Sequence, residues 1–115
     1  FEPREFTAAP GEAIKLTLTN PDVVPHNWVL LKPGSLQEVG EAANAFIADP
    51  TAAAKQYVPD NENILAYTDI VQPNKSETIY FTMPQTEGVH PFACTFPGHW
   101  MVMNGLLTLP QLPKR

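Results

Sequence analysis

Apolar and polar residues alternate with a period of two along most of this 115-residue chain, and this alternation restricts its fold more than any other feature. Ile14, Leu16 and Leu18, for example, share one face of an extended segment whose other face is polar. Turn signals such as Pro10-Gly11 separate the segments. Many short strands with turns between them are typical of a β-sandwich. The pattern predicts strands at residues 1–7, 13–19, 26–31, 64–71, 76–83, 88–94 and 105–109.

Residues 35–56 depart from this alternation and have helical spacing instead. Their apolar residues recur mostly three and four positions apart, at Leu36, Val39, Ala43, Phe46 and Ile47. Ser35 and Glu38 have the spacing of a capping box, in which each side chain satisfies a free backbone N–H at the start of a helix. Asp49-Pro50 should end this helix and could begin a short second one over residues 51–55. We expect the helical segment to pack its apolar stripe against the sandwich.

The chain has the size and composition of one globular domain, over residues 1–115. Hydrophobic residues make up 43% and charged residues 17%, which argues against a disordered chain or a coiled coil. The net charge of −5 comes from scattered acids, so nucleic acid and anionic membranes are not expected partners. Because the chain starts at Phe1 and ends after a proline-spaced tail, we expect a domain excised or processed from a longer protein.

Cys94 is the only cysteine, so the chain can form no internal disulfide. A single thiolate also excludes zinc ribbons and iron–sulfur clusters, which need several. His99, Met101 and Met103 follow Cys94 closely, and His26 lies far earlier on an expected strand. Two histidines, one cysteine and a weakly bound methionine are the ligand set of a blue copper electron-transfer site. Met101 is an alternative to Met103 as the weakly bound methionine. Without such a pattern around it, an isolated cysteine or histidine would more often be a core residue than a ligand.

Two short motifs resemble the copper-binding motifs of the cupredoxins, the blue copper proteins. They are Pro25-His26-Asn27-Trp28-Val29-Leu30 and Cys94-Thr95-Phe96-Pro97-Gly98-His99. The similarity covers nearly the whole chain and is closest to the azurins and the azurin-like auracyanins. It implies an all-β, Greek-key β-sandwich (cupredoxin-like) with a helical insertion at about 35–56 and one copper ion near one end. His26, Cys94 and His99 would be the three strong ligands, and Met103 the long axial ligand.

The same resemblance implies roles for residues beside the ligands. Asn27 would link the two motifs through Thr95, and the backbone N–H groups of Asn27 and Phe96 would point at the cysteine sulfur. Pro25 stands where azurin has glycine, so a weak contact from its carbonyl to copper is left open. His90 stands where the family usually has a buried tyrosine, and its separation from the cysteine favours a hydrogen-bonded core histidine over a ligand.

The resemblance implies a carrier of single electrons that cycles one copper ion between Cu(I) and Cu(II). An alternative is an electron-relay domain of a larger multidomain redox enzyme or of a membrane-anchored respiratory protein. Copper storage or delivery is less expected, because it favours exposed sites rich in methionine or cysteine. No nucleophile–base pair or paired carboxylates stand out, so neither an enzyme nor a small-molecule substrate is expected.

Expected partners are redox proteins such as c-type cytochromes or respiratory or photosynthetic complexes. The expected location is outside the cytoplasm, in the bacterial periplasm or on the outer face of the membrane, and the domain is expected to be monomeric. The edge of His99 is the expected electron port, with Pro97 and Trp100 beside it and Val23 and Val24 as further apolar neighbours. An exposed apolar surface of this kind suits a brief contact with another redox protein.

Overall fold

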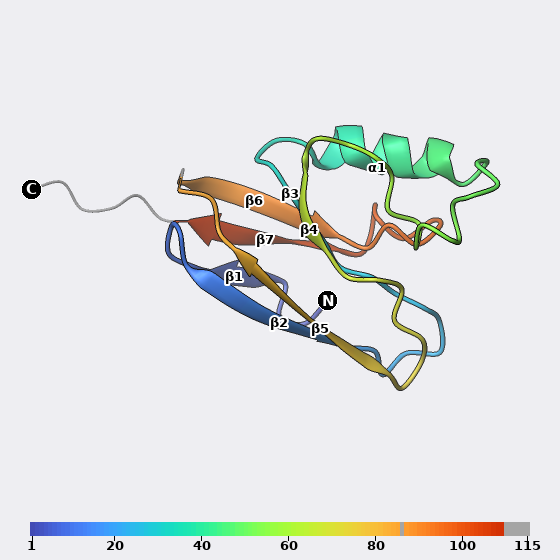
Figure 1. Ribbon diagram of the computed structural model, residues 1–115, viewed down its shortest axis with the longest axis horizontal. Coiled ribbons are helices and arrows are strands. Elements are labelled where there is room, and N and C mark those ends of the chain that lie inside the picture. The colour runs from blue at the N-terminus through green and yellow to red at the C-terminus, as the bar shows by residue number, and fades with distance from the viewer. Residues whose placement is uncertain (86, 110–115) are drawn as a thin grey trace, which may run out of the picture.

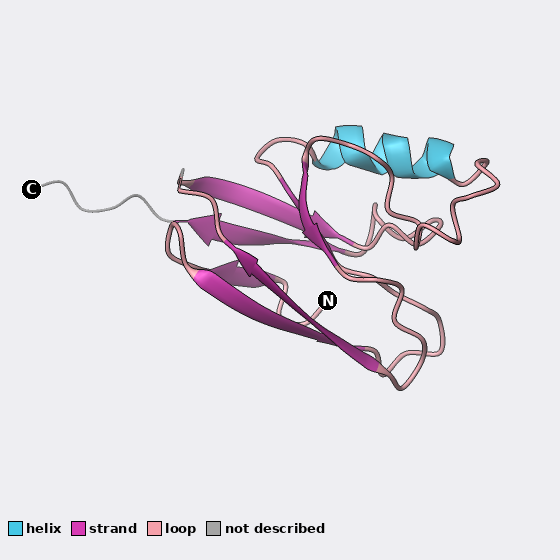
Figure 2. Ribbon diagram, viewed as in Figure 1, coloured by secondary structure: helices cyan, strands magenta, loops and turns pink. Residues whose placement is uncertain are grey.

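Two β-sheets form the layers of the fold, and one helix lies over the outer side of the larger sheet (Figures 1 and 2). The structure is a computed structural model that describes residues 1–85 and 87–109. Within these residues the elements are β1 (Glu5–Thr7), β2 (Ala13–Thr19), β3 (Val29–Leu31), α1 (Leu36–Phe46), β4 (Ile64–Tyr67), β5 (Ser76–Thr82), β6 (Gly88–Ala93) and β7 (Asn104–Leu109).

The larger sheet has the strand order β1-β7-β6-β3-β4, and β2 pairs with β5 in the smaller one. Only β1 and β7 run parallel; the other neighbours are antiparallel. Every predicted strand is present, and the fold is the expected Greek-key sandwich. Three predicted strands are clearly shorter than expected, and the first of them, β1, begins only at Glu5. β4 ends at Tyr67, and β3 begins at Val29, because the chain before it meets the sheet only through a bridge between His26 and Val71.

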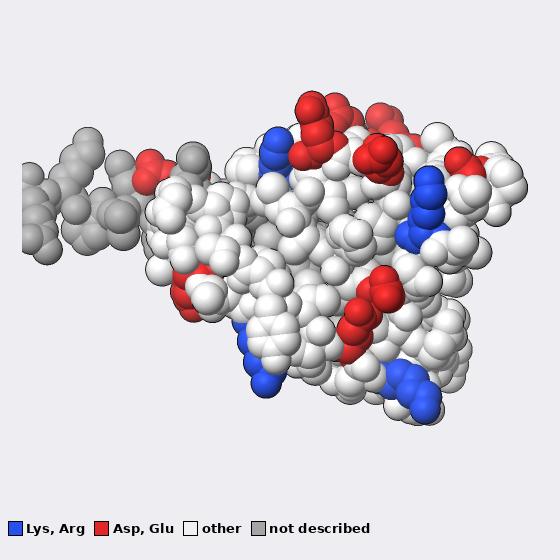
Figure 3. Space-filling view, in the orientation of Figure 1, with Lys and Arg blue, Asp and Glu red and all other residues white. Residues whose placement is uncertain are grey.

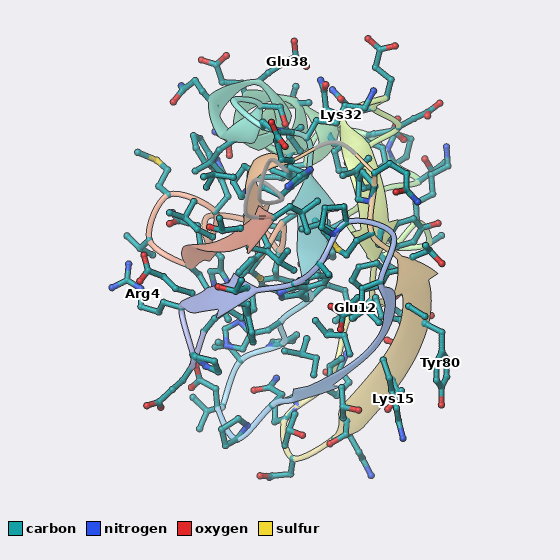
Figure 4. All side chains as sticks on the ribbon, turned by 90° about the vertical axis from the view of Figure 1, so that its left-hand side faces the viewer. Arg4, Glu12, Lys15, Lys32, Glu38 and Tyr80 are labelled. Atoms are coloured by element: carbon teal, nitrogen blue, oxygen red, sulfur yellow. The ribbon has the colours of Figure 1, made fainter. Side chains whose placement is uncertain are left out.

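The core lies between the two sheets and follows the period-two pattern. On β2, Ile14, Leu16 and Leu18 face inward and pack against the buried cluster. Trp28 and Phe92 form the centre of that cluster, with their ring centroids 5.4 Å apart. The opposite faces of β2 and β5 are exposed, and Figure 4 shows the paired residues Lys15 and Tyr80 pointing away from the sandwich.

The helix begins where predicted, but the capping box is wrong. Ser35 makes no side-chain cap; its hydroxyl donates to the carbonyl of Lys32 at 2.6 Å. Glu38 instead accepts a hydrogen bond from the side chain of Asn63. The turn before the helix therefore uses the serine hydroxyl that the capping box required. The apolar stripe packs on the larger sheet, where Val39 is buried with Val29 of β3.

The short second helix that Asp49-Pro50 could begin over residues 51–55 is absent from the described chain. This stretch forms consecutive turns, and Gln56 and Tyr57 have φ values of 60° and 59°. Two successive residues with left-handed φ values end this run of turns, because a right-handed helix cannot continue through them. The end of this segment, at Gln56 and Tyr57, contacts Asn27 and Phe96 of the site described below.

No helix of residues 1–85 and 87–109 has the length and apolar character needed to cross a membrane. On the face shown in Figure 3, lysine and arginine side chains lie singly, whereas several acidic side chains gather above α1. This face therefore carries no continuous basic surface of the kind that binds nucleic acid.

Candidate metal centre

Cys94 and His26 lie at the same end of the sandwich because β3 and β6 are antiparallel neighbours. Val29 of β3 pairs with Ala93 of β6. The residues just before β3 and those just after β6 therefore leave the sheet side by side. The loop from β6 to β7, which carries His99 and Met103, lies at this same end (Figure 1).

Two imidazole nitrogens face the cysteine sulfur. Cys94 Sγ is 3.8 Å from His26 Nδ1 and 3.6 Å from His99 Nδ1, and the three ligand atoms lie within 4.8 Å of one another. Cys94 is fully buried and His26 nearly so, whereas His99 is half-buried. The atoms are thus close enough to surround one ion, and a thiolate with two imidazoles suits copper.

The loop conformation brings Met103 back to the cysteine. The backbone N–H of Cys94 donates to the carbonyl of Met103 at 3.0 Å, and the N–H of Met103 donates to the carbonyl of His99 at 2.8 Å. Earlier in the loop, Gly98, with φ of 83°, provides the left-handed residue of the turn in which the His99 N–H donates to the carbonyl of Phe96. Met103 lines one groove together with His26. His26, Cys94, His99 and Met103 are therefore positioned to form a copper site.

The structure brings Asn27 and Thr95 together between the two motifs. Asn27 Nδ2 donates to Thr95 Oγ1 at 2.8 Å, and Asn27 Oδ1 accepts from the Thr95 N–H at 2.7 Å. The backbone N–H of Asn27 points at Cys94 Sγ, at 3.4 Å. Both residues are buried, so these hydrogen bonds hold the ligand segments in place without competition from water.

Burial raises the pKa of the Cys94 thiol, and the backbone N–H groups of Asn27 and Phe96 partly oppose this rise. Burial also lowers the pKa of His99, and the neighbouring His26 lowers it further. Both effects disfavour charge on the ligands when the site holds no cation. Copper ligation requires the thiolate and the neutral imidazole, so binding should release the thiol proton.

Trp100 lies where the sequence prediction does not place it. Its side chain is only 7% exposed, its ring packs over Gly40 of α1, and its Nε1–H donates to Asn44 Oδ1 at 3.2 Å. The prediction of an exposed Trp100 at the electron port is wrong, because the helical insertion covers the indole. Pro97 is half-buried. Other apolar residues of the site loops are exposed instead: Val23 by 87%, Met101 by 70% and Val102 by 82%.

His90 is a core residue and not a ligand. It is 2% exposed on β6 and lies outside the cluster of three ligand atoms. Within residues 1–85 and 87–109 no hydrogen-bond partner reaches His90 Nδ1, so the expected hydrogen bonding of this histidine is incomplete at that nitrogen. Burial lowers its pKa.

Two further contacts, one to the ligand His26 and one to Phe96 beside the ligand His99, were not predicted. The Asp22 carboxylate lies 2.9 Å from His26 Nε2. The ring of Tyr57 stacks edge-on against Phe96, which in turn lies against His99. Neither contact has a signal in the sequence, because Asp22 lies in an irregular loop and Tyr57 lies at the end of a run of turns that no local pattern indicates.

Residues 1–110 match the copper binding proteins of the plastocyanin/azurin family. Auracyanin-A of Chloroflexus aurantiacus is 33% identical over 111 residues, which cover 95% of this chain and 66% of that protein. Azurin of Pseudomonas aeruginosa is 34% identical over 91 residues, which cover 76% of this chain and 58% of that protein. The chain therefore spans less than two thirds of the length of these two curated relatives.

The fold matches solved structures of an auracyanin and of an azurin from other bacteria. A dithionite-reduced auracyanin from Roseiflexus castenholzii superposes with a TM-score of 0.81 at 33% identity, covering 96% of this chain and 86% of that one. An azurin from Methylomonas sp. strain J superposes with a TM-score of 0.76 at 20% identity, which supports the fold alone. With the family match over almost its whole length and a thiolate facing two imidazoles at one end of the sandwich, the chain belongs to the plastocyanin/azurin family of copper-binding proteins.

Proposed function

We propose that this domain binds one copper ion and carries single electrons between redox proteins. The observation that carries the proposal is the approach of Cys94 Sγ to within 3.8 and 3.6 Å of the two Nδ1 atoms of His26 and His99. Copper supplies a one-electron couple between Cu(I) and Cu(II) in a site of this composition. Auracyanin A, a structural relative at 32% identity, is described as a "blue" copper protein, which supports the same chemistry here.

The three atoms that face one another supply the strong ligands in this proposal, and Met103 is the weak axial ligand. The thiolate and thioether favour Cu(I), whereas imidazoles suit Cu(II) as well. A site held by Asn27 and Thr95 changes little when an electron arrives, since the sheet and these hydrogen bonds hold the ligand segments. The protein thereby supplies geometry and burial, and the metal supplies the chemistry.

We propose the edge of His99 as the electron port. His99 is more exposed than His26, and apolar Val23, Met101 and Val102 are exposed on the two loops of this end. Pro97 lies in the β6–β7 loop beside His99. Trp100 belongs to the same loop, but its side chain is buried and is not part of the proposed port. A small exposed apolar surface allows a partner to approach without removing water from charged groups.

The partners and the setting follow from the family resemblance and are proposals. We propose redox proteins such as c-type cytochromes or respiratory or photosynthetic complexes as donor and acceptor, outside the cytoplasm. We do not propose an enzymatic reaction. A relay domain within a longer redox protein would use the same site in the same way, and the sequence of the full-length gene would distinguish the two.

An absorption titration tests the proposal. Addition of Cu(II) to the metal-free protein should produce an intense visible band that saturates at one equivalent, because thiolate-to-copper charge transfer requires a bound Cys94. A Cys94→Ser variant should lack that band even where it retains some copper, since a hydroxyl cannot replace the soft thiolate. The wild-type protein failing to develop the band, or the variant keeping it, would refute the assignment.

A further inference from the structure

The nitrogen of His26 that faces away from the copper ligands is hydrogen-bonded to a carboxylate. His26 Nδ1 faces Cys94 Sγ, while His26 Nε2 lies 2.9 Å from Asp22 Oδ2. The histidine ring is almost fully buried, but the Asp22 side chain is 52% exposed. A carboxylate can only accept this hydrogen bond, so the proton belongs on Nε2 and the lone pair on Nδ1.

The loop that carries Asp22 is held in place by the buried residue Asn20. Asn20 Nδ2 donates to the carbonyls of Val24 at 2.8 Å and Val71 at 2.9 Å, and Asn20 Oδ1 accepts from the backbone N–H of Asp22 at 2.9 Å. Asp22 Oδ1 in turn accepts from the N–H of Val23 at 2.7 Å. One carboxylate oxygen is therefore held by the loop, and the other is directed at the imidazole.

Asn20 also joins the loop that carries Asp22 to the rest of the sandwich. The backbone N–H of Asn20 donates to the carbonyl of Lys75, and its own carbonyl accepts from the N–H of Asn74. Val71 also forms the two-bond bridge with the backbone of His26. Asp22 and the ligand histidine thus share a support through Val71, which preserves their relative position.

We propose that Asp22 is a positioning residue that fixes the tautomer and orientation of the copper ligand His26 and thereby lowers the reduction potential of the site. This inference rests on the proposed copper site. A carboxylate behind an imidazole makes the opposite nitrogen a stronger donor. Stronger donation stabilises Cu(II) more than Cu(I), which disfavours reduction.

The metal-free protein provides the first test, by long-range ¹H–¹⁵N NMR of the His26 ring at about pH 8, above the ordinary histidine pKa of about 6.5. We expect the Nε2–H tautomer in the wild-type protein and in Asp22→Asn, because an amide oxygen still accepts the hydrogen bond. Asp22→Ala should show a substantial share of the Nδ1–H tautomer. A wild-type ring that is not mainly Nε2–H, or an Asp22→Ala ring unchanged from wild type, overturns the inference.

The copper-loaded protein provides the second test. Asp22→Ala should lower the affinity for Cu(II) by roughly 10- to 100-fold while changing that for Cu(I) less. Each tenfold difference between the two raises the potential by about 59 mV. Asp22→Asn should lie between Asp22→Ala and wild type, because it keeps the acceptor and loses the charge.

Asp60→Asn is the matched control for charge. Asp60 is exposed, and in the part of the chain that the structure describes it makes no hydrogen bond or ion pair with a histidine. This variant should keep the wild-type tautomer and nearly the wild-type potential. A potential in Asp22→Ala no higher than in Asp60→Asn overturns the inference, and if Asp22→Ala does not fold, Asp22→Asn is compared in its place. Failure of the wild-type protein to become blue would refute the proposed function instead, and the tautomer result would still stand.

Discussion

The side-chain amide of Asn27 joins the segment that carries His26 to the loop that carries His99, through two hydrogen bonds to Thr95 of 2.8 and 2.7 Å. His26 and Cys94 are 68 residues apart, so no local peptide could hold both. The link is buried and is made by protein atoms alone. We therefore expect the ligand segments to be preorganised before copper binds.

Replacing Asn27 by alanine should destabilise the metal-free protein. The Thr95 hydroxyl and N–H would stay buried without partners, at a cost of about 1–3 kcal/mol for each unpaired group. Urea denaturation measures the change. Gln72→Ala is the control, because its side chain is exposed, and it should alter the free energy of unfolding by less than about 0.5 kcal/mol. Equal stability of Asn27→Ala and wild type would contradict a supporting role.

Removal of copper should leave the domain folded, with a lower melting temperature. Pairing of β3 with β6 and the Asn27–Thr95 hydrogen bonds form the site without the ion. Copper at a thousandfold excess over its Kd should add about 4 kcal/mol to the free energy of unfolding. Thermal melts with copper and with a chelator measure the difference. A chelated protein without β-sheet circular dichroism would refute the preformed site.

Replacing Met103 by leucine should preserve the blue band and raise the reduction potential. Loss of a weak axial donor removes stabilisation from Cu(II) more than from Cu(I). A tenfold differential corresponds to about 59 mV in voltammetry. Met101→Leu is the matched control, because Met101 is 70% exposed in the same loop, and its potential should stay close to wild type. A lowered potential in Met103→Leu, or an equal shift in both variants, argues against an axial role.

Replacing Trp100 by glutamate should destabilise the protein, so this variant cannot be used to test the electron port. The indole is buried against Gly40 and hydrogen-bonded to Asn44. Its removal alone should therefore lower the free energy of unfolding by about 3–5 kcal/mol. Val102→Glu places the same charge on an 82% exposed residue. That variant should keep its spectrum and stability while slowing electron self-exchange, measured by NMR line broadening. Unchanged exchange in Val102→Glu would move the proposed port elsewhere.

The stability of the metal-free protein should fall on acidification through His90. Burial lowers the pKa of His90 in the folded state, whereas the unfolded chain keeps a value near 6.5. Between these values the unfolded state binds more protons, so the free energy of unfolding decreases as the pH falls. His90→Phe should show a smaller decrease between about pH 7.5 and pH 5.5, measured by urea denaturation. Parallel curves for the two proteins would exclude His90 as the source.

Much of the fold and of the metal centre could be predicted from short patterns. Residues that alternate with a period of two must face opposite sides of a strand, so the inward positions of β2 followed from the sequence. Cys94, His99 and Met103 lie in one loop, where spacing limits how far apart they can be. His26 is distant in sequence, so residue type alone suggested it as the second imidazole, and the resemblance of its motif then implied its role as a ligand.

The predictions that failed concern side chains with more than one available partner. The Ser35 hydroxyl could cap the helix or bond the preceding turn, and the turn places the carbonyl of Lys32 within 2.6 Å. Trp100 could face solvent or the interior, and Gly40 of the insertion leaves room for its ring. Local sequence does not decide such choices, because the competing partners come from other parts of the chain.

The sequence by itself determined the strand pattern, the start of the helix and the donor atoms available to a metal, since these depend on residue type and local spacing. Only the tertiary structure decided that Asp22 lies against His26 and that the insertion buries Trp100. The contact of Asn27 with Thr95 was expected from the family resemblance, and the fold provides its geometry. The physical reason is that hydrogen bonds and packing require atoms within a few ångströms of each other. For residues far apart in the chain, the pairing of β3 with β6 and the packing of α1 set that distance.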